Sequence, residues 1–185
     1  MRFFWMFLYV ASVYMANRTM NDFMDLGWFG MLSVGTLYFG AVFTLRDKLH
    51  TYGLRVVFVA IALALLVNVV MAYQYDTPIR IIVASFTGIL ISELADTGIY
   101  QQFKAKSWLT RAMTSNAVSI PLDSFFFSFM AFYGVNSAFE FLHEGALPTT
   151  DIMKIIWADL LFKTLVAGGL ALLINMYKTK RMGKQ

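Results

Sequence analysis

Two acidic residues, Glu93 and Asp96, lie inside an otherwise apolar stretch that runs from Ile79 to Tyr100. A spacing of three residues puts both carboxylates on one face of a helix, and Tyr100 joins that face one turn further on. An ionisable group at the depth of a membrane costs at least about 2.5 kcal/mol, so such a residue is expected to serve a function. Carboxylates in this setting can bind a cationic or hydrogen-bond-donating solute, or carry a proton.

A second set of polar residues follows helical spacing before position 48. Small or polar side chains recur at steps of three or four residues, at Ser33, Thr36, Gly40, Thr44 and Asp47. Such a stripe is typical of close helix packing in membranes, and it could equally line a path for a polar solute. Arg46 and Asp47, at the end of the stripe, are either a solvated helix end or the mouth of that path.

Two further apolar stretches carry polar groups at membrane depth. Asn116 and Asp123 are seven residues apart and therefore share one helix face. Asp159 and Lys163 are four residues apart with the acid first, which is the better order for an ion pair within a helix. Lys163 is also expected to be drawn to Asp123 or Glu93 inside a bundle.

Each of these residues also has a purely structural interpretation. Glu93 could form an ion pair with another helix, Asp96 could reach the membrane interface, and Asp159 alone could neutralise Lys163. The functional interpretation rests on the convergence of polar groups from four stretches, in which acidic residues outnumber basic ones. This surplus favours a cationic or donor-rich solute, or a proton.

The elements that must position these groups are six apolar stretches, most of them near the ~20 residues that a helix needs to cross a bilayer. They cover about residues 2–16, 28–45, 54–73, 79–100, 112–133 and 152–177. The first is short for a full crossing, at about 22 Å of helical rise. Helices are favoured because lipid offers no partners for backbone groups. The prediction is one domain over residues 1–185, an all-α integral membrane protein forming a six-transmembrane-helix bundle.

Composition supports a membrane protein. Hydrophobic residues make up 59% of the 185 residues and charged residues only 14%, against about 25% charged in soluble domains. The absence of cysteine excludes disulfides, thiol catalysis and thiolate metal sites. Both histidines, His50 and His143, are expected in loops, so no metal site and no cofactor are predicted.

Lysines and arginines gather on one side of the predicted bundle. Eleven fall at the chain ends or beside the connections after the second and fourth stretches: Arg2, Arg46, Lys48, Arg55, Lys104, Lys106, Arg111, Lys178, Lys180, Arg181 and Lys184. The opposite side has Arg18 and Arg80, beside the acidic residues Asp22, Asp25, Asp76, Glu140, Glu144 and Asp151. Because positively charged loops stay in the cytoplasm, both termini are predicted to be cytoplasmic. The net charge of +4 is therefore a topology signal, and no direct nucleic-acid binding is expected.

Several short blocks resemble the VUT (vitamin uptake transporter) family of queuosine precursor transporters. The blocks are Phe43–Asp47, Ser92–Asp96 with Tyr100, Ser115–Asn116, Asp123–Ser124 and Ala131–Gly134. The resemblance covers residues 38–134 well and the sixth stretch, through Lys163, less closely. The sequence departs from the family at residues 53–55, where many relatives have a glycine followed by two arginines, and at Gly168-Gly169.

The resemblance implies import of a small-molecule 7-deazaguanine base, with a 7-cyano or 7-aminomethyl group, across the bacterial inner (plasma) membrane for queuosine synthesis in tRNA. Besides this substrate, the lipid bilayer is the expected partner, and a homo-oligomer is left open. Carried over to this sequence, the resemblance implies substrate-binding or coupling roles for Arg46, Asp47, Glu93, Asp96, Asn116 and Asp123, to which we add Lys163.

The chemistry of the base fits these residue types. One carboxylate, of Glu93 or Asp123, could accept both the N1–H and the 2-amino group of the guanine-like edge. Asn116 or Lys163 could donate to the carbonyl, and aromatic side chains could stack on the planar rings. Asp96 is expected to serve as a gate or as the partner of Arg46.

Other classes of function fit less well. An intramembrane serine protease needs a histidine at membrane depth, and none is expected there. A two-aspartate protease using Asp96 and Asp123 would lack a glycine-rich context around the second aspartate, and the repeated pore-loop sequence of small channels is missing. The remaining alternative is a substrate-capture subunit for a base or vitamin that needs a partner for transport, because the family is thought akin to the six-helix binding subunits of vitamin importers.

Overall fold

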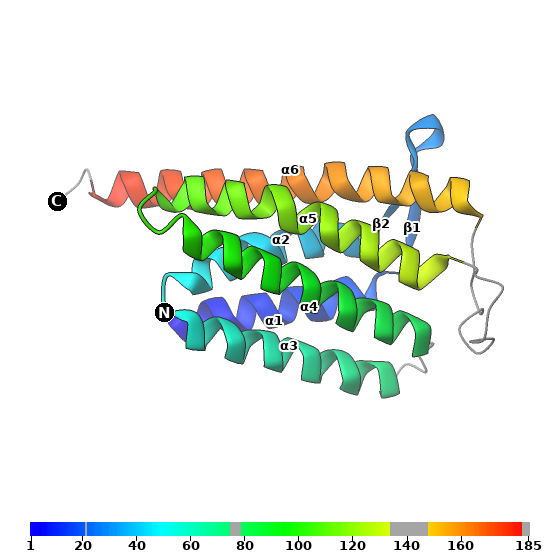
Figure 1. The fold of residues 1–185 in the computed structure, drawn as a ribbon, viewed down its shortest axis with the longest axis horizontal. Helices are drawn as coiled ribbons and strands as arrows, with labels where there is room; N and C mark the ends of the chain where they lie inside the picture. The colour runs from blue at the N-terminus through cyan, green and yellow to red at the C-terminus, as the bar shows by residue number, and fades with distance from the viewer. Residues whose placement is uncertain (21, 75–78, 134–147, 183–185) are drawn as a thin grey trace.

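The computed structural model describes residues 1–20, 22–74, 79–133 and 148–182. Within these residues the chain forms six α-helices and one small hairpin (Figure 1). The helices are α1 Arg2–Arg18, α2 Val34–His50, α3 Leu54–Gln74, α4 Ile79–Gln102, α5 Trp108–Phe132 and α6 Thr149–Met182. The predicted helical bundle is therefore present, apart from the hairpin between α1 and α2.

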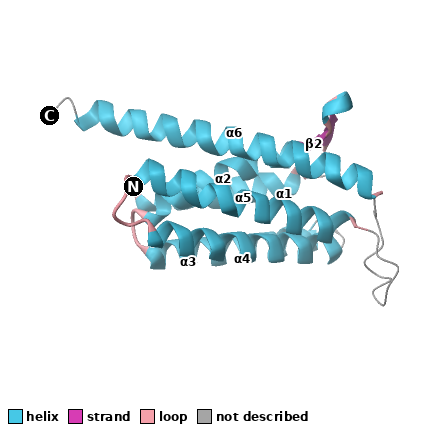
Figure 2. Cartoon of the chain, turned by 45° about the horizontal axis from the view of Figure 1, so that its top comes forward, coloured by secondary structure: helices cyan, strands magenta, loops and turns pink. Residues whose placement is uncertain are grey.

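The helices lie side by side along the long axis of the molecule, and both termini lie at the same end (Figure 1). Helix α6 packs against α2 and α5, α4 packs against α5, and α1 packs against α2 and α3 (Figure 2). This arrangement brings the C-terminal halves of α2 and α4 next to the N-terminal half of α5. Five of the seven predicted site residues belong to these segments.

The second predicted helix begins at Val34 rather than at Trp28, because a hairpin precedes it. Strands β1 (Phe23–Asp25) and β2 (Met31–Ser33) pair antiparallel around a short 3-10 turn, η1 (Gly27–Phe29). The Ser33 Oγ caps α2 by accepting the Gly35 N–H at 3.1 Å. Apolar and aromatic residues alone do not separate a short strand from the start of a helix.

Several cations assigned to loops lie in helices instead. Arg46 and Lys48 belong to α2, Arg55 to α3 and Arg111 to α5, which begins at Trp108 rather than Ala112. His50 was expected in a loop and is instead the buried last residue of α2. Other residues of the charge argument lie outside the described residues, or have no described side chain: Asp76, Arg80, Glu140, His143, Glu144, Lys180, Arg181 and Lys184.

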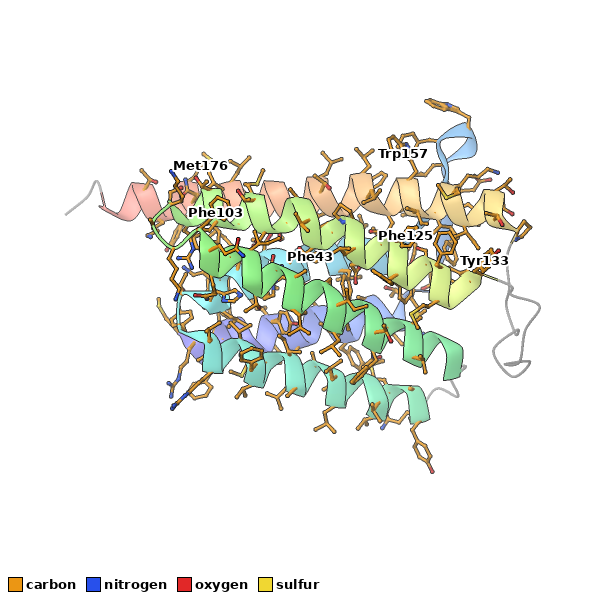
Figure 3. The ribbon with its side chains drawn as sticks, viewed as in Figure 1. Phe43, Phe103, Phe125, Tyr133, Trp157 and Met176 are labelled. Atoms are coloured by element: carbon orange, nitrogen blue, oxygen red, sulfur yellow. The ribbon has the colours of Figure 1, made fainter. Side chains whose placement is uncertain are left out.

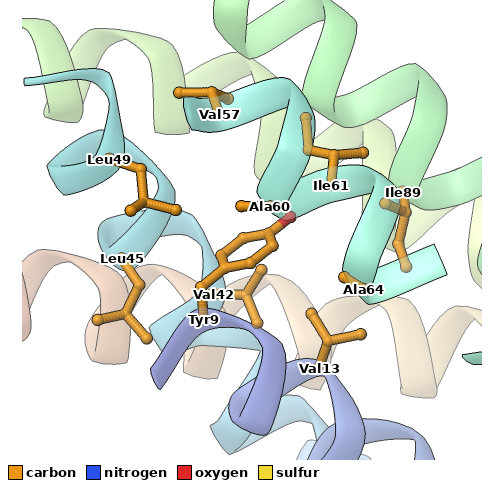
Figure 4. Packing of buried hydrophobic residues seen from close by; sticks show 10 residues of the cluster. All are labelled: Tyr9, Val13, Val42, Leu45, Leu49, Val57, Ala60, Ile61, Ala64 and Ile89. Atoms are coloured by element: carbon orange, nitrogen blue, oxygen red, sulfur yellow. The ribbon is translucent and has the colours of Figure 1, made fainter. Parts of the chain in front are cut away.

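A buried apolar cluster joins α1, α2, α3 and α4, and Tyr9 of α1 lies within it (Figure 4). The outer faces of α3 and α6 expose large apolar residues, and Trp157 and Met176 point away from the bundle (Figure 3). Helix α3 and residues 149–179 of α6 are long and apolar enough to cross a membrane. This combination fits a helical membrane protein, since water would not favour such outer faces.

Helices α2 and α6 approach closely at Gly40. A Cβ added at Gly40 would lie 2.8 Å from the Cβ of Val166 and 3.2 Å from the Cα of Lys163. One turn further on, the Thr44 hydroxyl donates to the backbone carbonyl of Ala167 at 2.8 Å. The helix-packing interpretation of the polar stripe is therefore confirmed at Gly40 and Thr44.

Gly40→Ala is expected to destabilise the protein by about 1–3 kcal/mol, because the added methyl group overpacks the contact between α2 and α6. Gly98→Ala in α4 is the matched control, since a Cβ added at Gly98 meets no atom within 4 Å. Alanine at that position should instead stabilise the helix by up to about 1 kcal/mol. Thermal unfolding of both variants in lipid nanodiscs measures the difference, and equal melting temperatures for Gly40→Ala and the wild type would contradict the close approach.

Candidate functional site

Arg46 is the centre of a first buried cluster, which we call the arginine cluster and define as Arg46, Asp47, Glu93, Asp96 and Asn116. Its Nη2 lies 2.5 Å from Asp96 Oδ1, and its Nη1 lies 3.1 Å from Glu93 Oε1. The Nη2 also lies 3.9 Å from Asp47 Oδ1 and donates to Asn116 Oδ1 at 3.3 Å. The expected pairing of Arg46 with Asp96 is therefore present.

Arg46 and Asp47 do not form a solvated helix end. Both side chains are fully buried, and α2 continues past them to His50. The guanidinium also stacks over the Phe43 ring, 5.0 Å from its centroid. One of the eleven cations used to predict topology is therefore an interior charge rather than a loop charge.

Aromatic donors fix the arginine cluster from three helices. Tyr9 of α1 donates to Glu93 Oε1 at 3.1 Å. Tyr100 of α4 and Trp108 of α5 both donate to the backbone carbonyl of Asp47, at 3.2 and 3.1 Å. Tyr100, predicted to share the acidic face of its helix, thus holds the backbone of α2 in place. The cluster therefore ties α1, α2, α4 and α5 together.

The arginine cluster contains more acid than base. Three carboxylates face one guanidinium, which gives a formal charge of −2 if all four groups are ionised. Among the described residues, no hydrogen-bond partner reaches either Asp47 oxygen, Glu93 Oε2 or Asp96 Oδ2. Because a buried unpaired charge costs several kcal/mol, this arrangement is suited to taking up positive charge.

Lys163 is the centre of a second cluster, the lysine cluster, defined as Lys163, Asp123, Ser124, Asp159 and Thr36. The Lys163 ammonium donates to Asp123 Oδ2 at 2.7 Å, to Asp159 Oδ2 and, at 3.4 Å, to the Ser124 hydroxyl. The Thr36 hydroxyl donates to the other Asp159 oxygen at 2.5 Å. Lys163 therefore makes both the pair within its own helix and the predicted pair with α5.

A partly open cavity lies against the lysine cluster. Its polar lining comes from Asn17, Ser33, Thr36, Ser85, Asp123, Ser128, Asp159 and Lys163. Its apolar walls are formed chiefly by Phe23, Phe39, Phe127 and Phe132. Mostly apolar walls with a few polar groups are typical of a small-molecule site.

The structure separates the predicted site residues into two groups. Asp123 and Lys163 line the cavity, whereas Arg46, Asp47, Glu93, Asp96 and Asn116 form the arginine cluster and do not line it. Sequence reasoning placed all seven in one polar pathway, because shared helix faces do not reveal how far along the bundle two residues meet.

Several cavity residues were missed in the sequence. Ser85 is hydrogen-bonded to Asn17 at 3.1 Å and to Asn68 at 2.9 Å. Ser128 is buried, lines the cavity and has a hydroxyl with no partner among the described residues. Spacing could have indicated both, since Ser85 lies seven residues before Ser92 and Ser128 lies four after Ser124.

Comparison with known protein families gives one match. Residues 33–177 match the family described as "Putative vitamin uptake transporter". The matched range includes every residue of the arginine cluster and the lysine cluster. No curated protein and no solved structure matches the chain.

Proposed function

Because the chain belongs to the vitamin uptake transporter family, which is matched over most of its length, we propose that it imports a queuosine precursor. The proposed substrate is a 7-deazaguanine base carrying a cyano or an aminomethyl group. The family is one of transporters, so the protein is assigned to membrane transport rather than to catalysis. The choice of substrate rests on the resemblance of this sequence to queuosine precursor transporters in the blocks around Asp47, Glu93 and Asp123, together with the chemistry of the cavity.

The cavity beside the lysine cluster is the observation that carries this proposal. A planar two-ring base could stack on a phenylalanine wall and turn its guanine-like edge to Asp123, whose carboxylate can accept two adjacent N–H groups. The base carbonyl could accept from Lys163, which lines the same space. Of the two carboxylates considered for this role, Asp123 lines the cavity and Glu93 does not, so the role is proposed for Asp123.

We also propose that the six helices all cross the bacterial inner membrane, with both termini in the cytoplasm. The end of the bundle that holds the termini also holds Arg55, Lys104, Lys106 and Lys178, as expected for the cytoplasmic side. The hairpin residues Phe23 and Ser33 line the cavity, which therefore lies toward the opposite end of α2 from Arg46. In this orientation the cavity faces outward and the arginine cluster closes the path to the cytoplasm.

Ser128→Phe is expected to abolish uptake, because the ring would occupy the space proposed for the base. A loss of only about 1.4 kcal/mol of binding free energy already weakens binding tenfold. Ser128→Ala is the matched control, since it removes an unpartnered hydroxyl and leaves the space open. The measurement is restoration of queuosine in cells that cannot make the base and lack their own carrier.

Three outcomes of this experiment are informative. Restoration by the wild type and by Ser128→Ala, without restoration by Ser128→Phe, would support transport through the cavity. Equal restoration of queuosine by all three proteins would show that the base binds outside this cavity. No restoration by the wild type, although the protein reaches the membrane, would contradict the proposed substrate.

A further inference from the structure

The proposed function uses the cavity and the lysine cluster, and it leaves the chemistry of the arginine cluster unused. The arginine cluster does not line the cavity, so its charges are not required to contact a substrate held there. Burying four charged groups is nonetheless expensive, and apolar residues of similar volume often replace such groups without loss of stability. The arrangement within the cluster indicates what these groups do.

Asp47 is the carboxylate that Arg46 leaves unneutralised. Asp96 lies 2.5 Å from the guanidinium and also accepts the Ser119 hydroxyl at 3.3 Å. Glu93 lies 3.1 Å from the guanidinium and accepts the Tyr9 hydroxyl. Asp47 lies 3.9 Å away, is fully buried, and neither of its oxygens has a hydrogen-bond partner among the described residues.

The groups that face Asp47 from the surrounding helices do not supply the missing positive charge. Asn116 of α5 lies near the Asp47 carboxylate, yet its amide Nδ2 is not in hydrogen-bonding geometry with either oxygen. The titratable and charged groups around the cluster are Tyr9 of α1, Arg46 and His50 of α2, Glu93, Asp96 and Tyr100 of α4, and Arg111 of α5. Arg111 donates to the Tyr100 backbone carbonyl and stacks on the Tyr100 ring, 3.9 Å from the centroid. It therefore contacts Tyr100 at the edge of the cluster rather than the Asp47 carboxylate.

We propose that Asp47 is the proton-binding residue that couples transport to a proton gradient. The coupling part rests on the proposed function, whereas proton binding by Asp47 does not. The step is a proton transfer alone, in which the carboxylate takes up a proton from one side of the membrane and releases it to the other.

The position of Asp47 explains how its proton would control the path. Its backbone carbonyl is held by Tyr100 and Trp108, so Asp47 lies where α2 meets α4 and α5. Protonation changes the formal charge of the cluster from −2 to −1 and lets Arg46 remain on Asp96 and Glu93. Loss of the proton draws the Arg46 guanidinium toward Asp47. This weakens the contacts of Arg46 with Glu93 and Asp96 of α4 and loosens the cytoplasmic end of the bundle.

The test is Asp47→Asn in the purified protein reconstituted into liposomes. Asparagine has the shape of the protonated carboxyl and cannot release a proton. We expect accumulation of the labelled base driven by a pH gradient to be lost, while exchange of base across the vesicle membrane, which needs no net proton movement, continues. Asp151→Asn, which alters a partly exposed carboxylate paired with Lys154, is the control and should keep both. Accumulation by Asp47→Asn that follows the pH gradient as in the wild type would overturn the proposal, as would accumulation by the wild type that follows a sodium gradient only.

A second measurement needs no substrate and separates this proposal from the proposed function. Infrared difference spectra of the protein in lipid, recorded as the pH is changed, should contain the carbonyl band of a protonated carboxyl. We expect Asp47→Asn to lack that band and Glu93→Gln to retain it. If the wild type transports no deazaguanine, the proposed function fails, and this band still decides the role of Asp47. A spectrum in which Asp47→Asn retains the band unchanged overturns the assignment.

Discussion

Arg46→Met is expected to destabilise the protein by about 3–5 kcal/mol or more, because it leaves buried carboxylates without their cation. Arg46 is the only base among three acids in the arginine cluster, and its side chain is fully buried. Since folded proteins are stable by only about 5–15 kcal/mol, a loss of this size removes a large share of the total. The expected result is a low yield of folded protein and a sharply lower melting temperature in detergent.

A triple variant distinguishes the loss of a cation from the loss of packing. Methionine retains much of the apolar length of arginine, so adding Glu93→Gln and Asp96→Asn to Arg46→Met removes two of the three carboxylate charges while keeping the shape. This variant should recover part of the lost stability, because one buried carboxylate without a cation costs less than three. A wild-type melting temperature for Arg46→Met alone would show that the guanidinium does not hold these carboxylates.

Lys163→Met is the second substitution with a large expected effect. The Lys163 ammonium donates to carboxylates from α5 and α6, and among the described residues it is the only cation that lines the cavity. Its removal leaves Asp123 and Asp159 facing each other across a buried contact, at a cost of about 3–5 kcal/mol if both stay ionised. Uptake should be lost as well, because Asp123 would no longer be held in place at the cavity wall.

Lys154→Met on the same helix is the control for Lys163→Met. Lys154 is largely exposed and pairs with Asp151 at 3.2 Å, an interaction worth about 0–1 kcal/mol. Thermal unfolding and uptake are measured for both variants under the same conditions. Equal, small effects of the two substitutions would contradict the role given to the lysine cluster.

The sequence predicted the helices and the main charge pairs, because membranes make unpaired charges costly. Asp96 was expected to be a gate or the partner of Arg46, and Lys163 was expected to be drawn to Asp123 or Glu93. The pairs that form are Arg46–Asp96 and Lys163–Asp123. The cost of an unpaired ionisable group at membrane depth limits the partners it can have, so residue type and helical face are informative. The functional roles of these residues stay predictions until variants are measured.

What the sequence did not predict depends on packing between helices. Helices α2 and α6 approach closely at Gly40, and this contact determines which of their residues touch. The spacing of residues within one helix does not reveal where along its length a second helix will pack. Because packing between helices could not be predicted, the predicted site residues were placed in one site although they form two clusters, and the cavity residue Ser128 was missed. The prediction that the second helix begins at Trp28 was wrong for a local reason, because the apolar stretch there includes a turn and a strand before α2 begins.

Uptake of labelled 7-deazaguanine bases by liposomes that contain only the purified protein decides whether this protein alone carries the base across a membrane. We expect the base to accumulate inside wild-type vesicles without any partner protein. Ser128→Phe and Lys163→Met vesicles should remain empty, whereas Ser128→Ala vesicles should fill. Binding of the base to wild-type vesicles without accumulation inside them would contradict transport by this protein alone and would identify a capture subunit instead.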